Sequence, residues 1–212
     1  MKRLLLASAA LILGATGCAG APPSPASGAP TAEAASAGAR LSLTTCNETC
    51  PLALGTYNAP VHDPFTITIE DGGWQQEPAD GSDEVLLSRT DNPTERLIFY
   101  PGPTGALADV EGLARLFETT PEVELGQPST VTIGGAPAVE GDATPTGSQP
   151  TSLLLAGNTI EVQPDRAYRF TVAQASMLEE GALHLIVTEA PSEDLAQFLP
   201  LADKILETLS FT

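Results

Sequence analysis

Side chains suited to acid–base or nucleophilic chemistry are few in this sequence. Its 212 residues include two histidines, His62 and His184, and histidine is the side chain most often used for proton transfer near neutral pH. His62 lies in a predicted turn, which favours an exposed loop position. His184 lies in a predicted strand on the opposite face from Leu183, which favours a structural, hydrogen-bonded histidine.

No catalytic motif accompanies these histidines. The sequence has no G-x-S-x-G nucleophile turn, no phosphate-binding G-x-x-x-x-G-K-[ST] loop, no H-E-x-x-H helix and no EF-hand loop. Gly134-Gly135 follows a predicted strand and indicates a hairpin or bulge rather than a nucleotide loop. We therefore expect no enzyme, no catalytic residue and no cofactor. An unrecognised hydrolase stays open, because sites assemble from residues distant in sequence.

Two acidic segments could supply oxygen ligands to calcium. Residues 80–84 read Asp-Gly-Ser-Asp-Glu, and residues 91–95 read Asp-Asn-Pro-Thr-Glu. Their spacing matches no defined calcium loop, so solvated turn residues are the expectation and no metal site is assigned.

Arginines and aromatic residues offer a second possible site. Arg96, Arg166 and Arg169 are conspicuous in so acidic a chain, and they could face a ligand pocket lined by aromatic side chains. Those aromatic residues are Tyr57, Trp74, Phe99, Tyr100, Tyr168 and Phe170. The favoured interpretation is that the aromatics fill the core and the arginines pair with carboxylates. No ligand-binding residue is assigned.

The first of three cysteines, Cys18, follows a segment typical of secretory signals. Lys2 and Arg3 precede an apolar run over residues 4–13, which is too short to span a bilayer. Residues 15–18, Ala-Thr-Gly-Cys, resemble the lipobox of bacterial lipoproteins. That resemblance implies removal of residues 1–17 and a lipid on Cys18 at the outer face of the cell membrane. An ordinary signal cleaved after Gly17 or Ala19 is the alternative.

If Cys18 carries lipid, Cys46 and Cys50 remain as a pair. In an oxidising compartment they can form a disulfide, provided that the three intervening residues turn tightly. A Cys-x3-Cys metal site is the rival, although no neighbouring ligands complete a tetrahedron.

Composition divides the remaining chain into a tether and one domain. Residues 18–40 are mostly Ala, Pro, Ser and Gly and predict a disordered tether, whereas residues 41–212 alternate apolar segments with turns. The formal charge is −18 and becomes more negative once Lys2 and Arg3 are removed. Such a chain excludes nucleic acid as a partner and leaves the lipid as its contact with the membrane.

Apolar alternation predicts an antiparallel sheet with two helices. In residues 65–69 the apolar side chains share one face. Further strands are expected at 84–88, 96–100, 130–133, 136–143, 152–156, 159–162, 168–173 and 183–189. One helix is expected after Asp109. The second is expected after Ser192 as N-cap, either kinked at Pro200 or divided there into a short first turn and a main helix. The predicted class is α+β, a mainly antiparallel sheet flanked by two helices.

Several segments of the domain resemble actinobacterial lipoprotein domains of the PsbP-like and LpqN-like type. They are residues 54–57, residues 65–74 ending in Gly-Gly-Trp, residues 131–135 with Pro137, and the ending from Phe198 to Phe211. The resemblance implies an antiparallel sheet flanked by helices and roles in binding or assembly, with no functional residue to transfer.

Three functions follow for the domain, and none identifies a protein or small-molecule partner. The leading hypothesis is a non-catalytic binding or assembly module, anchored outside the cytoplasm. A lipid or small-molecule carrier is the alternative, suggested by the apolar residues 153–155 and 183–187. The hydrolase is the third.

Overall fold

The computed structural model describes most of the chain from Arg40 onward. The described residues are 40–43, 48–59, 61, 64–78, 84–101, 112–113, 115, 118, 120–155, 158–175 and 182–211. They all belong to one compact unit, Ala37–Thr212. Cys18, the predicted tether up to Ala39, Cys46, His62, Asp109 and residues 79–83 lie outside them.

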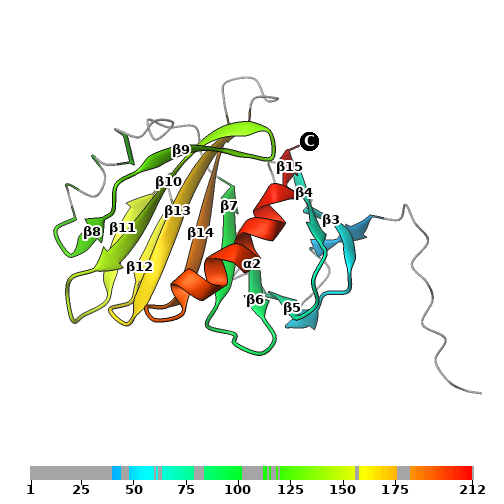
Figure 1. The fold of residues 1–212 in the computed structure, drawn as a ribbon, viewed down its shortest axis with the longest axis horizontal. Helices are drawn as coiled ribbons and strands as arrows, with labels where there is room; N and C mark the ends of the chain where they lie inside the picture. The colour runs from blue at the N-terminus through cyan, green and yellow to red at the C-terminus, as the bar shows by residue number, and fades with distance from the viewer. Residues whose placement is uncertain are drawn as a thin grey trace, which may run out of the picture. The chain divides into compact units, whose positions relative to one another are not determined.

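A nine-stranded sheet forms the larger part of this unit (Figure 1). Its path is β2-β5-β6-β7-β14-β13-β10-β8, with β9 beside β10, and every neighbouring pair is antiparallel. The strands are β2 Cys50–Pro51, β5 Trp74–Glu77, β6 Val85–Arg89, β7 Arg96–Pro101, β8 Val123–Leu125, β9 Ser129–Ile133, β10 Ala136–Pro145, β13 Arg166–Ala175 and β14 Ala182–Pro191.

Two smaller sheets complete the strands. A four-stranded sheet has the order β1-β3-β4-β15, from Leu41–Ser42, Gly55–Ala59, Phe65–Ile69 and Ser210–Phe211. Its β1 and β3 are parallel. The hairpin of β11, Thr151–Leu155, and β12, Asn158–Val162, forms a separate two-stranded sheet. The nine segments expected from alternation are thus all strands, whereas β1, β2, β3, β5, β8 and β15 were missed because they are short or lack clear alternation.

Helix α2, Leu195–Glu207, lies across one face of the large sheet (Figure 1). The expectation of two helices is corrected to one helix with defined ends among the described residues. Near the expected first helix, the described Gly112, Leu113, Arg115 and Glu118 have helical backbone conformation. Asp109 and the residues between those four are outside the described part.

The start of α2 also differs from the expectation. Asp194, not Ser192, occupies the N-cap position, and its side chain makes no capping hydrogen bond. The helix continues through Pro200 as one segment of 13 residues, so the expected division into a short first turn and a main helix is wrong. At its other end the C-cap Thr208 bonds β4, because its Oγ1 accepts a hydrogen bond from the Thr68 backbone N–H at 2.8 Å.

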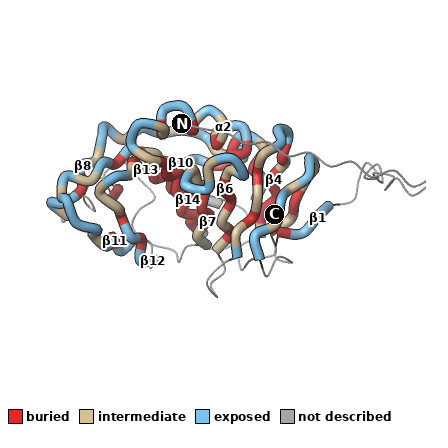
Figure 2. The backbone as a smooth tube through the Cα atoms, turned by 90° about the horizontal axis from the view of Figure 1, so that it is seen from below, coloured by how far each residue is buried: buried red, intermediate tan, exposed pale blue. Residues whose placement is uncertain are grey.

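The large sheet separates two apolar clusters, because successive residues of a strand point to opposite faces. On β7, Leu97 and Phe99 enter the cluster under α2 and β4, whereas Ile98 enters the cluster under β11 and β12. Figure 2 shows the buried positions along β14, β7 and β4, with exposed positions along the loops. This division decides which side chains can meet.

Candidate functional site

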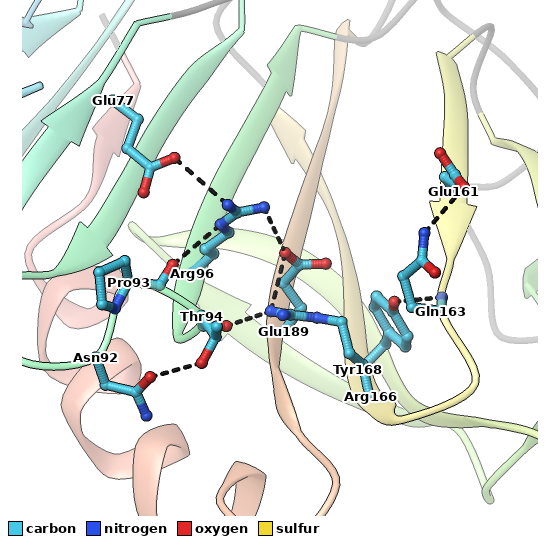
Figure 3. A network of polar contacts seen from close by, with 10 residues as sticks. All are labelled: Glu77, Asn92, Pro93, Thr94, Arg96, Glu161, Gln163, Arg166, Tyr168 and Glu189. Carbon is cyan, nitrogen blue, oxygen red and sulfur yellow. Dashed lines mark hydrogen bonds and ion pairs between the residues drawn. The ribbon is translucent and has the colours of Figure 1, made fainter. Parts of the chain in front are cut away.

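The residues with potential for chemistry lie at the edge of the sheet where β7 begins and β14 ends. Glu189, near the end of β14, is 7% exposed and stands opposite Arg96 in the β7–β14 register. Arg166, at the start of β13, is opposite Pro191 on the next strand. Because these positions share one sheet face, the two guanidinium groups flank one carboxylate (Figure 3).

Ion pairs connect this group into a network. Arg166 Nη2 lies 3.1 Å from Glu189 Oε1, and Arg96 Nη1 lies 3.5 Å from the same oxygen. Arg96 also reaches Glu77 of β5, with 3.7 Å between Nη2 and Oε2. Two cations therefore face two anions, and the network is balanced in charge.

Two loop carbonyls accept hydrogen bonds from the two arginines. Arg96 Nε donates to the Pro93 carbonyl at 3.2 Å, and Arg166 Nη2 donates to the Thr94 carbonyl. The Nε of Arg166 is buried without a hydrogen-bond partner among the described residues. The network thus joins β5, β7, β13, β14 and the loop between β6 and β7. We call its four charged residues, Glu77, Arg96, Arg166 and Glu189, the clamp, because they hold strand ends together.

Burial and charge act in opposite directions on Glu189. Burial raises its pKa above the usual range, and the guanidinium groups of Arg166 and Arg96 counteract this effect. A buried carboxylate without these cations would be far more costly, which explains why two arginines are placed here. The carboxylate holds the clamp together instead of facing an open cleft.

Two tyrosines beside the network are held in the protonated form. Burial, with a smaller contribution from the nearby Glu189, raises the pKa of Tyr168 to about 12. Burial, with Glu84 and Glu189, does the same for Tyr100, also to about 12. The Tyr168 oxygen accepts a hydrogen bond from the Gln163 backbone N–H at 2.8 Å. Neither phenol is suited to act as a base near neutral pH.

Of the three arginines considered together in the sequence, Arg169 is separated from the other two. It lies on the opposite face of β13 from Arg166 and holds Asp142 of β10, with 2.7 Å between Nε and Oδ1. Asp142 raises the pKa of Arg169, whereas burial raises the pKa of nearby Asp203 on α2. The interpretation that these arginines pair with carboxylates is confirmed.

The six aromatic side chains do not line one pocket. Tyr57, Trp74 and Phe99 belong to the cluster under α2, whereas Tyr168 and Phe170, with Tyr100 packed against them, belong to the other. The sheet lies between the two sets, so the ligand-pocket alternative is not supported.

Most of the apolar residues that suggested a carrier are packed against one another, whereas Leu154 is 67% exposed. Leu153 and Leu155 of the β11–β12 hairpin are at most 1% exposed and share a cluster with Leu183, Leu185 and Val187 of β14. Their surfaces are used to fix the hairpin on the sheet.

His184 is buried among aromatic rings on the α2 side. Its ring centroid lies 4.6 Å from that of Phe211 and 6.1 Å from that of Phe65. Leu183 and Leu185 belong to the opposite cluster, as alternation predicted. His62 lies outside the described residues.

In the acidic loop at residues 91–95, which is described, the polar side chains bind one another or Arg89. Asp91 binds Arg89, whose side chain lowers the pKa of that carboxyl, and Glu95 accepts a hydrogen bond from Asn92 at 3.0 Å. Among the described residues, no three His, Cys, Asp or Glu side chains lie close enough to hold a metal ion. The other acidic loop, residues 79–83 before Glu84, is not described.

Of the predicted cysteine pair, Cys50 is described and Cys46 is not. Cys50 lies on the edge strand β2, with its Sγ 3.3 Å from the Glu48 carbonyl oxygen. The disulfide therefore remains a prediction. Within the described part, no helix is long and apolar enough to cross a membrane.

Sequence reasoning did not identify Glu77 and Glu189. For Glu189 a signal was present, because Leu183, Leu185 and Val187 of the same strand face the core and Glu189 continues that alternation. A charged residue at an inward position indicates a buried partner of opposite charge.

No protein-family model matches the chain, and no curated protein matches it. Solved structures are similar at low identity. PsbP (CyanoP) from Synechocystis is 14% identical over 76% of this chain and 93% of its own, with a TM-score of 0.47. LpqN of Mycobacterium tuberculosis, a protein involved in cell envelope biogenesis, is 14% identical over 78% of this chain and 91% of its own, with a TM-score of 0.44.

A protein from Bacteroides thetaiotaomicron is 13% identical, with a TM-score of 0.38, over 70% of this chain and 45% of its own. A PsbP and an LpqN, the two kinds of domain that the sequence resembles, are therefore among the similar structures. Identities of 13–14% and TM-scores below 0.5 establish neither a shared family nor a shared function.

Proposed function

We propose that this protein is a lipoprotein anchored outside the cytoplasm by lipid on Cys18, and that its domain is a non-catalytic binding or assembly module. The observation that carries the anchor is Cys18 directly after a short apolar run and small residues. A lone cysteine at that position has no other role in the sequence, since Cys46 and Cys50 are four residues apart and can pair.

The contacts of the described domain support a binding role over catalysis. Arg96 and Arg166 are held by Glu77 and Glu189 in a clamp, and Arg169 is held by Asp142. Side chains engaged in this way stabilise strands and are poorly placed to transfer protons to a substrate. The function is therefore assigned to the outer surface of the domain and to its position at the membrane.

Removal of the Cys18 thiol tests the anchor. In bacteria labelled with a fatty acid, the wild-type chain should carry the label and sediment with membranes. Cys18→Ala should lose both properties, whereas Cys46→Ala, which also removes one thiol, should keep them. Equal labelling and sedimentation of Cys18→Ala would reject the anchor.

Affinity purification tests the binding role. The full chain, tagged at its C-terminus and cross-linked on intact cells, should recover the same protein in independent preparations and at saturable yield. Turnover of a substrate by a preparation that recovers no such protein would favour the hydrolase instead. Native mass spectrometry of fresh protein addresses the carrier, because a retained small molecule would add a discrete mass.

A further inference from the structure

Among the described strands, none pairs with the outer edge of β9. Within the described part of the chain β9 pairs with β10 alone, and Ser129, Thr130 and Thr132 are exposed. The strand reads Ser-Thr-Val-Thr-Ile, with no charged residue and no proline. Its β-branched residues favour extended backbone, and its outer N–H and C=O groups are available to another strand.

The other two terminal strands of the large sheet, β8 and β2, carry features that oppose strand addition. β8 has Glu124 at its centre, and β2 ends in Pro51, which has no N–H to donate. If two copies of β8 paired antiparallel about their centres, two Glu124 side chains would be opposed. In a chain of net charge −18, an uncharged edge is the kind that can meet its own copy without repulsion.

The register shows which backbone groups of β9 point outward. Thr132 is opposite Pro137 and Ile133 is opposite Ala136, across the two-residue turn Gly134-Gly135. The pair that closes such a turn is hydrogen-bonded, so the next pair, Thr132 and Pro137, is not. Pro137, which has no N–H, fits this position. The backbone groups of Thr130 and Thr132 therefore face away from β10.

Contacts at its end hold β9 in place. A Cβ added to Gly134 would lie 2.4 Å from the Leu209 carbonyl oxygen, so the turn packs directly on the chain before β15. Ile133 packs against the cluster under α2. An edge held in extended conformation before binding loses less conformational entropy when a partner strand is added.

We propose that β9 pairs antiparallel with β9 of a second copy of this chain, about a two-fold axis at Val131. Thr130 of one copy then stands opposite Thr132 of the other, and both contribute outward backbone groups. Val131 stands opposite its own copy in a pair without hydrogen bonds, and no two charges oppose each other. The contact is isologous, so it closes as a dimer.

The surface buried by two five-residue strands is below the roughly 1,200 Å² of stable complexes. The dimer is therefore weak in dilute solution. Lipid anchoring, as proposed above, confines the copies to one surface and raises their effective concentration. The strength of association rests on that proposed function, whereas the pairing geometry does not.

Cysteine cross-linking in the full chain tests the geometry. Two Val131 positions in a pair without hydrogen bonds have Cα atoms about 4.5 Å apart, which is within the range for a disulfide. Two Ser129 positions in the same dimer lie four residues apart along the strand, about 13 Å. After mild oxidation, Val131→Cys should give at least about fivefold more covalent dimer than Ser129→Cys. The wild-type chain gives the background of the native cysteines.

Substitutions at Thr132 distinguish cross-linking through paired strands from cross-linking through random collision of two copies. Thr132→Pro added to Val131→Cys removes an outward N–H and should reduce the dimer to the Ser129→Cys level. Thr132→Val keeps that N–H and should leave the dimer unchanged. Leu154→Cys, at a side chain 67% exposed on β11, reports collision through an apolar surface. Circular dichroism of each variant confirms folding.

Equal dimer from Val131→Cys, Ser129→Cys and Leu154→Cys would overturn the pairing. Membrane and soluble fractions of the same samples are compared. A chain found soluble and without fatty acid would refute the anchor alone. Oxidation of that soluble chain at raised concentration would still decide whether Val131 meets its own copy.

Discussion

The turn between β9 and β10 lies against Leu209, and a matched pair of glycine variants tests how close this approach is. Gly134 and Gly135 have φ values of +58° and +77°, a region where an alanine costs about 1 kcal/mol relative to ordinary backbone. Their surroundings differ. A Cβ at Gly134 would lie 2.4 Å from the Leu209 carbonyl oxygen, whereas nothing lies within 4 Å of one at Gly135.

The expected destabilisation by Gly134→Ala depends on which atoms must move to admit the new Cβ. Normal carbon–oxygen contact requires about 1 Å more space, and the obstacle is backbone, so the chain before β15 must shift. β15 pairs with β4, and Phe211 contacts His184. Forcing extra atoms into such packing costs about 1–3 kcal/mol. We expect Gly135→Ala to lower the free energy of unfolding by about 1 kcal/mol and Gly134→Ala by about 2–4 kcal/mol.

Urea unfolding followed by tryptophan fluorescence measures both variants. Trp74 is the single tryptophan, is 2% exposed, and lies with its ring centroid 5.8 Å from that of Phe198 on α2. Its emission therefore reports loss of the cluster under α2. Equal losses for the two variants, within about 0.5 kcal/mol, would refute the close approach of the turn to Leu209.

Three further experiments test other parts of the protein. Leu43→Ala removes a side chain with no exposure and should cost about 2–5 kcal/mol in urea unfolding, whereas Leu41→Ala, at 38% exposure, should cost less than about 1 kcal/mol. Burial raises the pKa of Glu189, so ionising this carboxyl lowers the free energy of unfolding at neutral pH. This loss of stability disappears as pH falls through the folded-state pKa. The free energy of unfolding of the wild type minus that of Glu189→Gln should therefore rise from about pH 7 to about pH 4, and a decrease would contradict a raised pKa. Alkylation of the exported protein should leave Cys46 and Cys50 unlabelled until a reductant is added, and labelling without reductant would reject the disulfide.

Local patterns in the sequence predicted most of the long strands. Alternation placed Ile67 and Ile69 in the core and His184 opposite Leu183, because the period of a strand is a property of the backbone. Apolar residues also recur at helical spacing in α2, and Leu195, Phe198, Ala202, Ile205 and Leu206 are buried. Its start was predicted wrongly, because Ser192 was expected as N-cap and Asp194 occupies that position.

The short edge strands could not be predicted. β2 and β15 have two residues each, too few for any period, and they exist because a longer strand offers them a partner. The same holds for the clamp. Arg96, Arg166 and Glu189 lie on three strands, and their meeting depends on register.

By itself, the sequence determined the acidic balance, the alternation of the main strands and the position of Cys18 after an apolar run, because each is a property of composition or of neighbouring residues. Tertiary structure alone decided that Arg96 and Arg166 meet at Glu189, that the aromatic residues divide between two clusters, and that β9 lies at an edge. The physical reason is that strand order and register are set by contacts between segments far apart in the chain, about which a local pattern contains no information.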